Sequence, residues 1–197
     1  VAPYTTGGLT AYRAAKKAAR HLVPGEYAVI IGVGGLGHIG IQALAALSAA
    51  EIIAVDKSDL ALGLAEESGA HHMVKADGNE TEAVLALTEG KGAEAVIDFV
   101  GEGGAIENGL AMTRNAGSYY IVGYGGRIEI PAIEMIITEK TIHGNLVGTY
   151  GELVELMALA ERGLVNLATR EYKLADANQA LHDLHAGTIK GRAVLIP

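Results

Sequence analysis

With 197 residues, half of them hydrophobic, the chain is long enough to form one substantial α/β domain with a full core. Its net charge of −8 argues against general binding to nucleic acids or acidic membranes, and one Phe with no Trp argues against an aromatic platform for single strands. Because Cys is absent, the chain by itself forms neither disulfides nor a thiolate zinc site, and no uninterrupted apolar run is long enough to span a bilayer.

Strands and helices alternate along the chain after an irregular start at 1–8. Apolar periodicity and helix-ending glycines predict helices at 9–22, 39–49, 58–67, 80–88, 103–114, 152–162 and 176–185. Short apolar runs predict strands at 28–31, 52–55, 72–75, 93–100, 117–122, 141–147 and 193–196, with a small extra strand at 128–130. This alternation predicts a doubly wound α/β fold, in which a six-stranded parallel Rossmann sheet carries helices on both faces.

The first predicted strand runs into the pattern Gly32-x-Gly34-x-x-Gly37, which opens the second predicted helix. Gly32 permits a tight turn, Gly34 lets the backbone approach a pyrophosphate, and Gly37 lets the helix pack close to the strand. Unbonded N–H groups at the start of that helix, with the positive end of its dipole, then face the phosphates. This order of strand, glycine turn and helix predicts a dinucleotide site. We expect His38 to sit on the first turn of the helix.

The second predicted strand ends at Asp56, at the spacing expected of a ribose-binding acid. A carboxylate at this place accepts both hydroxyls of an adenosine ribose and repels a 2′-phosphate, so NAD is favoured over NADP. The alternative is that Asp56 merely caps the next helix, a role that is open to Ser58 as well.

Further motifs are spread over nearly the whole chain, at 8–14, 32–38, 55–56, 98–101, 122–125 and 191–197. With them the chain resembles the coenzyme-binding domain of a zinc-type, NAD-dependent alcohol dehydrogenase of the medium-chain dehydrogenase/reductase superfamily, of the bacterial and archaeal type. The resemblance implies one NAD-binding Rossmann domain over 1–197, with about 1–24 and 187–197 as connections to a catalytic domain. The start at Val1, rather than Met, likewise leads us to expect a piece of a longer chain.

The resemblance also assigns roles to matching residues. Lys57 would lie beside Asp56 at the ribose, and backbone groups near Asn145 and Val147 would hold the nicotinamide carboxamide. Arg192 would reach the pyrophosphate, which suits a guanidinium; the alternative is a solvated Arg at a strand end. The full set of expected cofactor residues is Thr10, Gly32, Gly34, Gly35, Leu36, Gly37, Asp56, Lys57, Phe99, Val100, Gly101, Val122, Gly123, Tyr124, Asn145, Val147 and Arg192. Of these, Phe99, Val100 and Gly101 would border the adenosine, and Thr10, Val122 and Tyr124 the nicotinamide.

The expected zinc ligands are missing from the sequence. In the family that the chain resembles, the catalytic domain supplies most of them, and the third ligand, a Cys or Asp, falls here at Thr6. A neutral hydroxyl is a poor substitute for a thiolate or carboxylate. We therefore expect neither a metal site nor a catalytic residue in this chain, which should bind NAD(H) without turnover. Zinc would belong to the parent enzyme.

In the parent enzyme, the resemblance implies hydride transfer between a primary or secondary alcohol and NAD, giving an aldehyde or ketone, with zinc as a Lewis acid. It also implies a homodimer through the sheet edge at 141–147, or a tetramer in the parent. Because no signal-peptide pattern is present, we expect a cytoplasmic protein without a membrane or nucleic-acid partner.

Alternative functions stay open. A zinc-independent quinone or enoyl reductase of the same superfamily fits Thr6 and the absent cysteines. A non-catalytic nucleotide-binding module could dimerise through 141–147. A methyltransferase also uses a glycine turn and a strand-end acid, but the spacing of the glycines and the pair at 191–192 argue against it.

Overall fold

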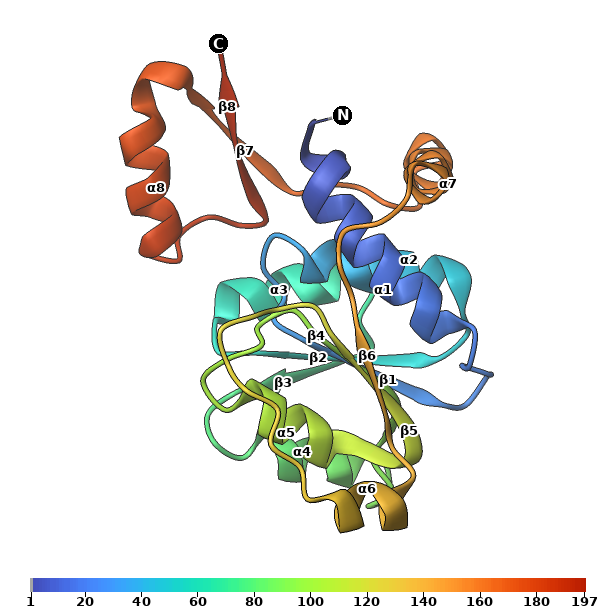
Figure 1. Ribbon diagram of the computed structural model, residues 1–197. Coiled ribbons are helices and arrows are strands. Elements are labelled where there is room, and N and C mark those ends of the chain that lie inside the picture. The colour runs from blue at the N-terminus through green and yellow to red at the C-terminus, as the bar shows by residue number, and fades with distance from the viewer. Residues whose placement is uncertain (1) are drawn as a thin grey trace.

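The computed structural model describes residues 2–197, in which six parallel strands form one sheet of order β3-β2-β1-β4-β5-β6 (Figure 1). Val1 lies outside the described residues, and the prediction of an irregular segment at 1–8 was wrong for residues 2–8, which are helical and lead directly into the first α-helix. The strands are β1 Tyr27–Ile31, β2 Glu51–Asp56, β3 His72–Lys75, β4 Ala93–Asp98, β5 Thr113–Ile121 and β6 Thr141–Gly144. The predicted doubly wound Rossmann fold is confirmed, and the strand order reverses between β1 and β4.

Helices cover both faces of the sheet (Figure 1). On one face lie α1 Leu9–Ala19, α2 Gly37–Leu47 and α3 Asp59–Glu67, and on the other lie α4 Glu80–Leu87 and α5 Ala105–Met112. Successive side chains of β1 show why both faces are covered: Ala28 and Ile30 join the core under α1 and α2, whereas Val29 and Ile31 join the core over α4 and α5. Side chains alternate between faces along a strand, so an uninterrupted apolar run needs a layer on each side.

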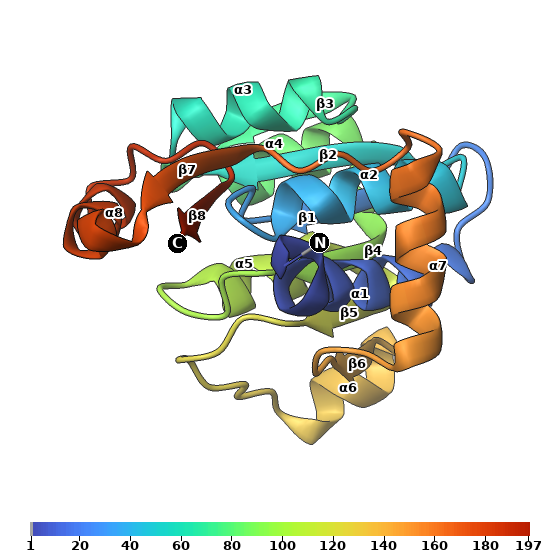
Figure 2. The same ribbon diagram turned by 90° about the horizontal axis from the view of Figure 1, so that it is seen from above.

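The remaining elements lie before α1, between β5 and β6, and after β6. They are the π-helix η1 Tyr4–Gly8, α6 Ala132–Thr138, α7 Tyr150–Glu161, β7 Thr169–Lys173, the 3₁₀-helix η2 Leu174–Asp176, α8 Ala177–His185 and β8 Arg192–Ile196. The predicted terminal strand, β8, pairs in parallel with β7 in a separate two-stranded sheet. Figure 2 shows this unit of β7, α8 and β8 standing apart from the main sheet, on the side where α2 begins.

Several predicted boundaries were wrong. The segment 128–130 forms no strand; Pro131 precedes α6 instead, a short helix whose isoleucines are exposed. The helix expected at 103–114 ends at Met112, and β5 begins four residues before the predicted 117. Strand β4 stops at Asp98 rather than 100, and β6 stops at Gly144 rather than 147. The residues that follow Asp98 and Gly144 belong to loops at the carboxyl ends of β4 and β6.

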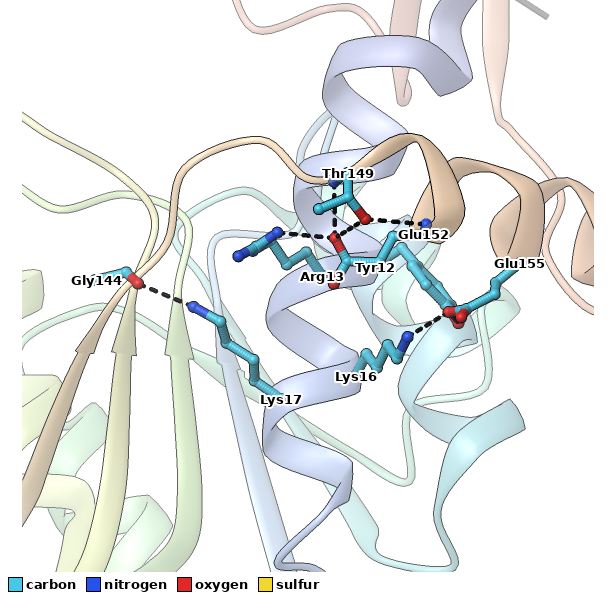
Figure 3. A network of polar contacts seen from close by, with 8 residues as sticks. All are labelled: Tyr12, Arg13, Lys16, Lys17, Gly144, Thr149, Glu152 and Glu155. Atoms are coloured by element: carbon cyan, nitrogen blue, oxygen red, sulfur yellow. Dashed lines mark hydrogen bonds and ion pairs between the residues drawn. The ribbon is translucent and has the colours of Figure 1, made fainter.

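A polar network holds α1 against α7 (Figure 3). Arg13 Nη1 donates to Glu152 Oε2 at 2.8 Å, and both Tyr12 Oη (2.7 Å) and Lys16 Nζ (2.5 Å) donate to Glu155 Oε2. Thr149 caps α7 by accepting from Glu152 N, and the Glu152 carboxylate accepts from Thr149 N in return. The network places the N-terminal part of α1, which carries Thr10, beside the loop that follows β6.

Candidate dinucleotide site

A cavity of about 710 Å³ opens at the carboxyl ends of β1, β2 and β4, where the strand order reverses. Its lining includes Gly32, Asp56, Lys57, Val100, Glu80 and Asn108. In doubly wound sheets the crevice at such a reversal is the place where ligands bind. The cavity therefore brings together residues that the sequence assigned separately to the turn, the ribose and the adenosine.

The glycine turn leads from β1 into α2 as predicted. Gly32 has a φ of +84°, a left-handed conformation that favours glycine, and its N–H donates to Val55 O at 2.9 Å. A Cβ on Gly37 would lie only 2.0 Å from Gly32 O, so the start of α2 packs directly on the turn. Leu36 is the N-cap of α2 and offers no side-chain cap, which leaves the first N–H groups of the helix to another partner.

Gly34 differs from the other turn glycines. Among the described residues, apart from its chain neighbours, no heavy atom lies within 4 Å of a Cβ built on Gly34. The chain itself therefore does not require glycine there for packing. The space beside Gly34 is free for a ligand that approaches the backbone closely, which is what a pyrophosphate at this turn needs.

Asp56 ties the end of β2 to the glycine turn. Its Oδ2 accepts from Val33 N at 2.7 Å and its Oδ1 accepts from Ser58 N at 2.8 Å. The N-cap of α3 is Ser58, whose hydroxyl accepts from Ala61 N, so the capping role belongs to Ser58. Each carboxylate oxygen has about two acceptor positions, and these bonds fill one on each; the predicted ribose contact needs the others. Asp56 and Lys57 both line the cavity.

Asp98 is a buried organiser of the site that sequence analysis placed only within the motif 98–101. Its Oδ1 accepts from Val100 N (2.7 Å) and Gly101 N (2.9 Å), and its Oδ2 accepts from Tyr119 Oη at 2.5 Å. Burial, followed by the hydrogen bond to Asp98, raises the pKa of Tyr119, which keeps this phenol a donor. The signal in the sequence that could have predicted this role is an acid at the end of a buried strand with a glycine three residues later, at Gly101.

The loops after β4 and β5 touch through two glycines. A Cβ on Gly101 would lie 2.2 Å from the carbonyl carbon of Gly123, and one on Gly123 would lie 2.2 Å from that of Val100. The N–H groups of Val122 and Gly123 both donate to Asp98 O, at 2.9 and 3.0 Å. Phe99, which was expected to border the adenosine, does not line the cavity, because its ring packs against Gly40 of α2. Val100 does line the cavity.

The residues expected at the nicotinamide lie around the ends of β5 and β6. Asn145 Nδ2 donates to Ile121 O and His143 O, both at 3.1 Å, and so joins the two strand ends. Val147 has a φ of +43°, and Gly148 packs on Leu9, which brings this loop next to Thr10. Tyr124 follows β5 and is 92% exposed. Asn145 thus joins the ends of β5 and β6, and the loop after β6 reaches the start of α1 at Leu9.

Arg192, the first residue of β8, reaches back across 157 positions to the glycine turn. Its Nη1 donates to Gly35 O at 3.4 Å. The same Nη1 would lie only 2.3 Å from a Cβ built on Gly7. The guanidinium thus sits between η1 and the turn, beside the position expected for the pyrophosphate. The alternative of an Arg pointing away into solvent does not match this placement.

His38, fully buried on the first turn of α2, links the turn to the segment before β7. Its Nδ1 bonds Gly34 O at 2.8 Å and its Nε2 accepts from Ala168 N at 3.3 Å. Burial lowers the pKa of His38, and the bond to Ala168 N requires a neutral Nε2. Arg192 N donates to Ala168 O at 2.9 Å, so the same segment also anchors β8.

A model of the zinc-binding dehydrogenase family matches residues 35–162. The chain belongs to the zinc-binding dehydrogenase family. It is 36% identical to an NAD-dependent alcohol dehydrogenase from Sulfurisphaera tokodaii, over all of this chain and 57% of that protein. The crystal structure of the alcohol dehydrogenase from Aeropyrum pernix superimposes with a TM-score of 0.96 at 44% identity, over 99% of this chain and 57% of that one.

A third match carries a bound cofactor. The acetophenone reductase from Geotrichum candidum, solved in complex with NAD, aligns with a TM-score of 0.85 and 26% identity, over 100% of this chain and 55% of that chain. The chain therefore spans little more than half the length of the relatives that it matches. The alcohol dehydrogenase relatives favour the main hypothesis over the quinone or enoyl reductase.

The described part of this chain contains no ligand set for the zinc that the family's description names. Thr6 is exposed in η1, and its carbonyl accepts from Thr10 Oγ1 at 2.7 Å. Within residues 2–197, no group of three or more His, Cys, Asp or Glu side chains is placed to hold a metal. The residues of this chain do not fit a catalytic zinc. No helix in the same residues is long and apolar enough to cross a membrane.

Proposed function

We propose that this chain is the NAD(H)-binding part of an NAD-dependent alcohol dehydrogenase. The observation that carries the proposal is the Asp56 carboxylate, which is bonded to the glycine turn through Val33 N and lines the cavity at the strand-order reversal. The open space at Gly34 and the Arg192 guanidinium beside Gly35 support a pyrophosphate between them. The names of the relatives support the same cofactor.

The proposed reaction of the whole protein is hydride transfer between a small primary or secondary alcohol and NAD, with an aldehyde or ketone as the product. Within it, this chain binds the dinucleotide and orients the nicotinamide through the loops that follow β5 and β6. No residue of the chain is assigned to Lewis-acid or proton-transfer chemistry, so we expect the chain alone to bind cofactor without turning over an alcohol. A cytoplasmic location stays a prediction.

Replacing the ribose acid tests the cofactor assignment. We expect Asp56→Asn to weaken NADH binding by about tenfold, because a charge-assisted hydrogen bond to the ribose is lost. NADPH binding should change less, since the carboxylate repels its 2′-phosphate in the original chain. Calorimetric titration of both cofactors measures the change in preference.

Asp59→Asn is the matched control, because Asp59 is an exposed acid three residues after Asp56, at the start of α3, and pairs with Lys75. It should leave the NADH-to-NADPH preference unchanged. Tighter binding of NADPH than of NADH by the original chain would overturn the assignment and support a zinc-independent reductase.

We also propose that two copies associate through the β6 edge. In the described residues β6 hydrogen-bonds to β5 alone, and α6 exposes Ile133, Ile136 and Ile137 next to this edge in the sequence. An open strand edge with apolar neighbours is a template for pairing with a second chain. We extend the proposal to the whole protein, which would form this dimer or a tetramer.

Ile136→Glu should shift the chain from dimer toward monomer in light scattering, because the 69% exposed side chain contributes to the apolar patch and not to the fold. Leu184→Glu on α8 is the control: it replaces another exposed apolar residue, far from β6, and should keep the dimer. A monomeric original chain at high concentration would refute the pairing.

A further inference from the structure

One wall of the cavity carries a polar pair that the proposed function leaves without a role. Glu80 is the first residue of α4 and is only 8% exposed, and Asn108 lies on α5. Asn108 Nδ2 donates to Glu80 Oε1 at 2.6 Å, and Gly78 N donates to Glu80 Oε2 at 2.7 Å. Both side chains line the same cavity as Asp56.

The carboxylate has acceptor capacity beyond these contacts. Burying a carboxylate costs free energy unless its oxygens accept hydrogen bonds. Its two oxygens offer about four acceptor positions. The two partners named above are both neutral amides and fill two of these positions. The cavity is the neighbouring space from which a ligand N–H could reach the others.

The position of the pair along the cavity indicates which part of the ligand meets it. The glycine turn and Arg192 mark the pyrophosphate, and Asp56 marks the adenosine ribose one step further from the turn. The base then continues into the space between Lys57 and Val100 and the wall formed by α4 and α5. On that wall, the Glu80 carboxylate and the Asn108 amide lie against each other and are hydrogen-bonded.

We propose that Glu80 and Asn108 recognise the exocyclic amino group of the cofactor's adenine, and so select adenine over bases with a carbonyl at that position. This inference rests on the proposed function. An ionised carboxylate only accepts hydrogen bonds, and the amino group of adenine only donates them here. The amide of Asn108 is free to meet a ring nitrogen of the base with its second N–H. A carbonyl oxygen facing Glu80 would be repelled.

The test compares NADH with its hypoxanthine counterpart, deamino-NADH, which carries a carbonyl in place of the amino group. We expect the original chain to bind NADH at least about tenfold more tightly, because a hydrogen bond to a buried charge is replaced by a repulsive contact. Glu80→Gln should reduce this ratio to about two or less, since its amide can donate to the carbonyl. Calorimetric titration gives both affinities.

Glu82→Gln is the matched control, because Glu82 is exposed on the same first turn of α4 and should leave the ratio unchanged. If the pair is only structural, Glu80→Gln lowers both affinities together and the ratio stays constant, which overturns the inference. Equal affinity of the original chain for the two cofactors overturns it too, and this measurement needs no variant. NADH binding persists in both of these outcomes, whereas its absence from the original chain would refute the proposed function itself.

Discussion

Gly37→Ala is expected to reduce NADH affinity at least about 100-fold and to lower the free energy of unfolding by about 3 kcal/mol. The added Cβ would lie 2.0 Å from Gly32 O and 2.9 Å from Gly32 C, and both are backbone atoms that cannot swing aside. Relief requires α2 to move away from the turn, and that movement removes its N-terminal N–H groups from the pyrophosphate position. Urea unfolding and NADH titration measure the two effects.

Gly34→Ala separates binding from folding. Its Cβ would meet no described residue within 4 Å beyond the chain neighbours, so we expect the urea midpoint to stay close to that of the original chain. NADH binding should still weaken, because the methyl group occupies the space that the pyrophosphate approaches. A large loss of stability in Gly34→Ala, or normal NADH binding by Gly37→Ala, would contradict this account of the turn.

Asp98→Ala is expected to lower the free energy of unfolding by about 4 kcal/mol. The change removes the carboxylate that accepts hydrogen bonds from Val100 N, Gly101 N and Tyr119 Oη. These donors would then lack this acceptor. The loop that follows β4 borders the cavity, so NADH affinity should fall with stability. Urea unfolding of the variant measures the loss, and a change below about 0.5 kcal/mol would show that the buried acid is not the organiser of this loop.

Asp98→Asn is the conservative companion. An amide keeps the shape, and its oxygen can still accept from the two backbone N–H groups while its NH₂ group faces the Tyr119 oxygen. We expect a smaller loss, about 1 to 2 kcal/mol, because charge assistance disappears and the phenol must find another acceptor. Tyr119→Phe in both backgrounds then gives the coupling energy of the Asp98–Tyr119 pair.

Residue spacing in the sequence could not predict the long-range partners of the site, for a physical reason. Arg192 meets Gly35 across 157 positions, and His38 meets Ala168 across 130. Which arginine or histidine finds such a partner depends on how β7 and β8 fold back on α2. The resemblance suggested Arg192, whereas nothing in residue spacing suggested His38 or the pairing of Glu80 with Asn108.

Weakly patterned elements were missed for a different reason. Four of the five side chains of β7 are exposed, so the segment lacks the alternation that marks a half-buried strand. The segment 128–130 does alternate, but it pairs with no strand among the described residues, and the isoleucines that follow belong to α6. Hydrogen-bond partners, rather than local preference, decided both cases.

The sequence by itself determined the sheet, the glycine turn and the ribose acid, because each depends on neighbouring residues: apolar runs, a glycine spacing, and an acid that ends a strand. Only the tertiary structure decided what closes the site. Asp98 bridges β4 and β5, Glu80 meets Asn108 between two helices, and Arg192 arrives from the far end of the chain. Such contacts form between segments whose separation in sequence carries no information about their distance in space.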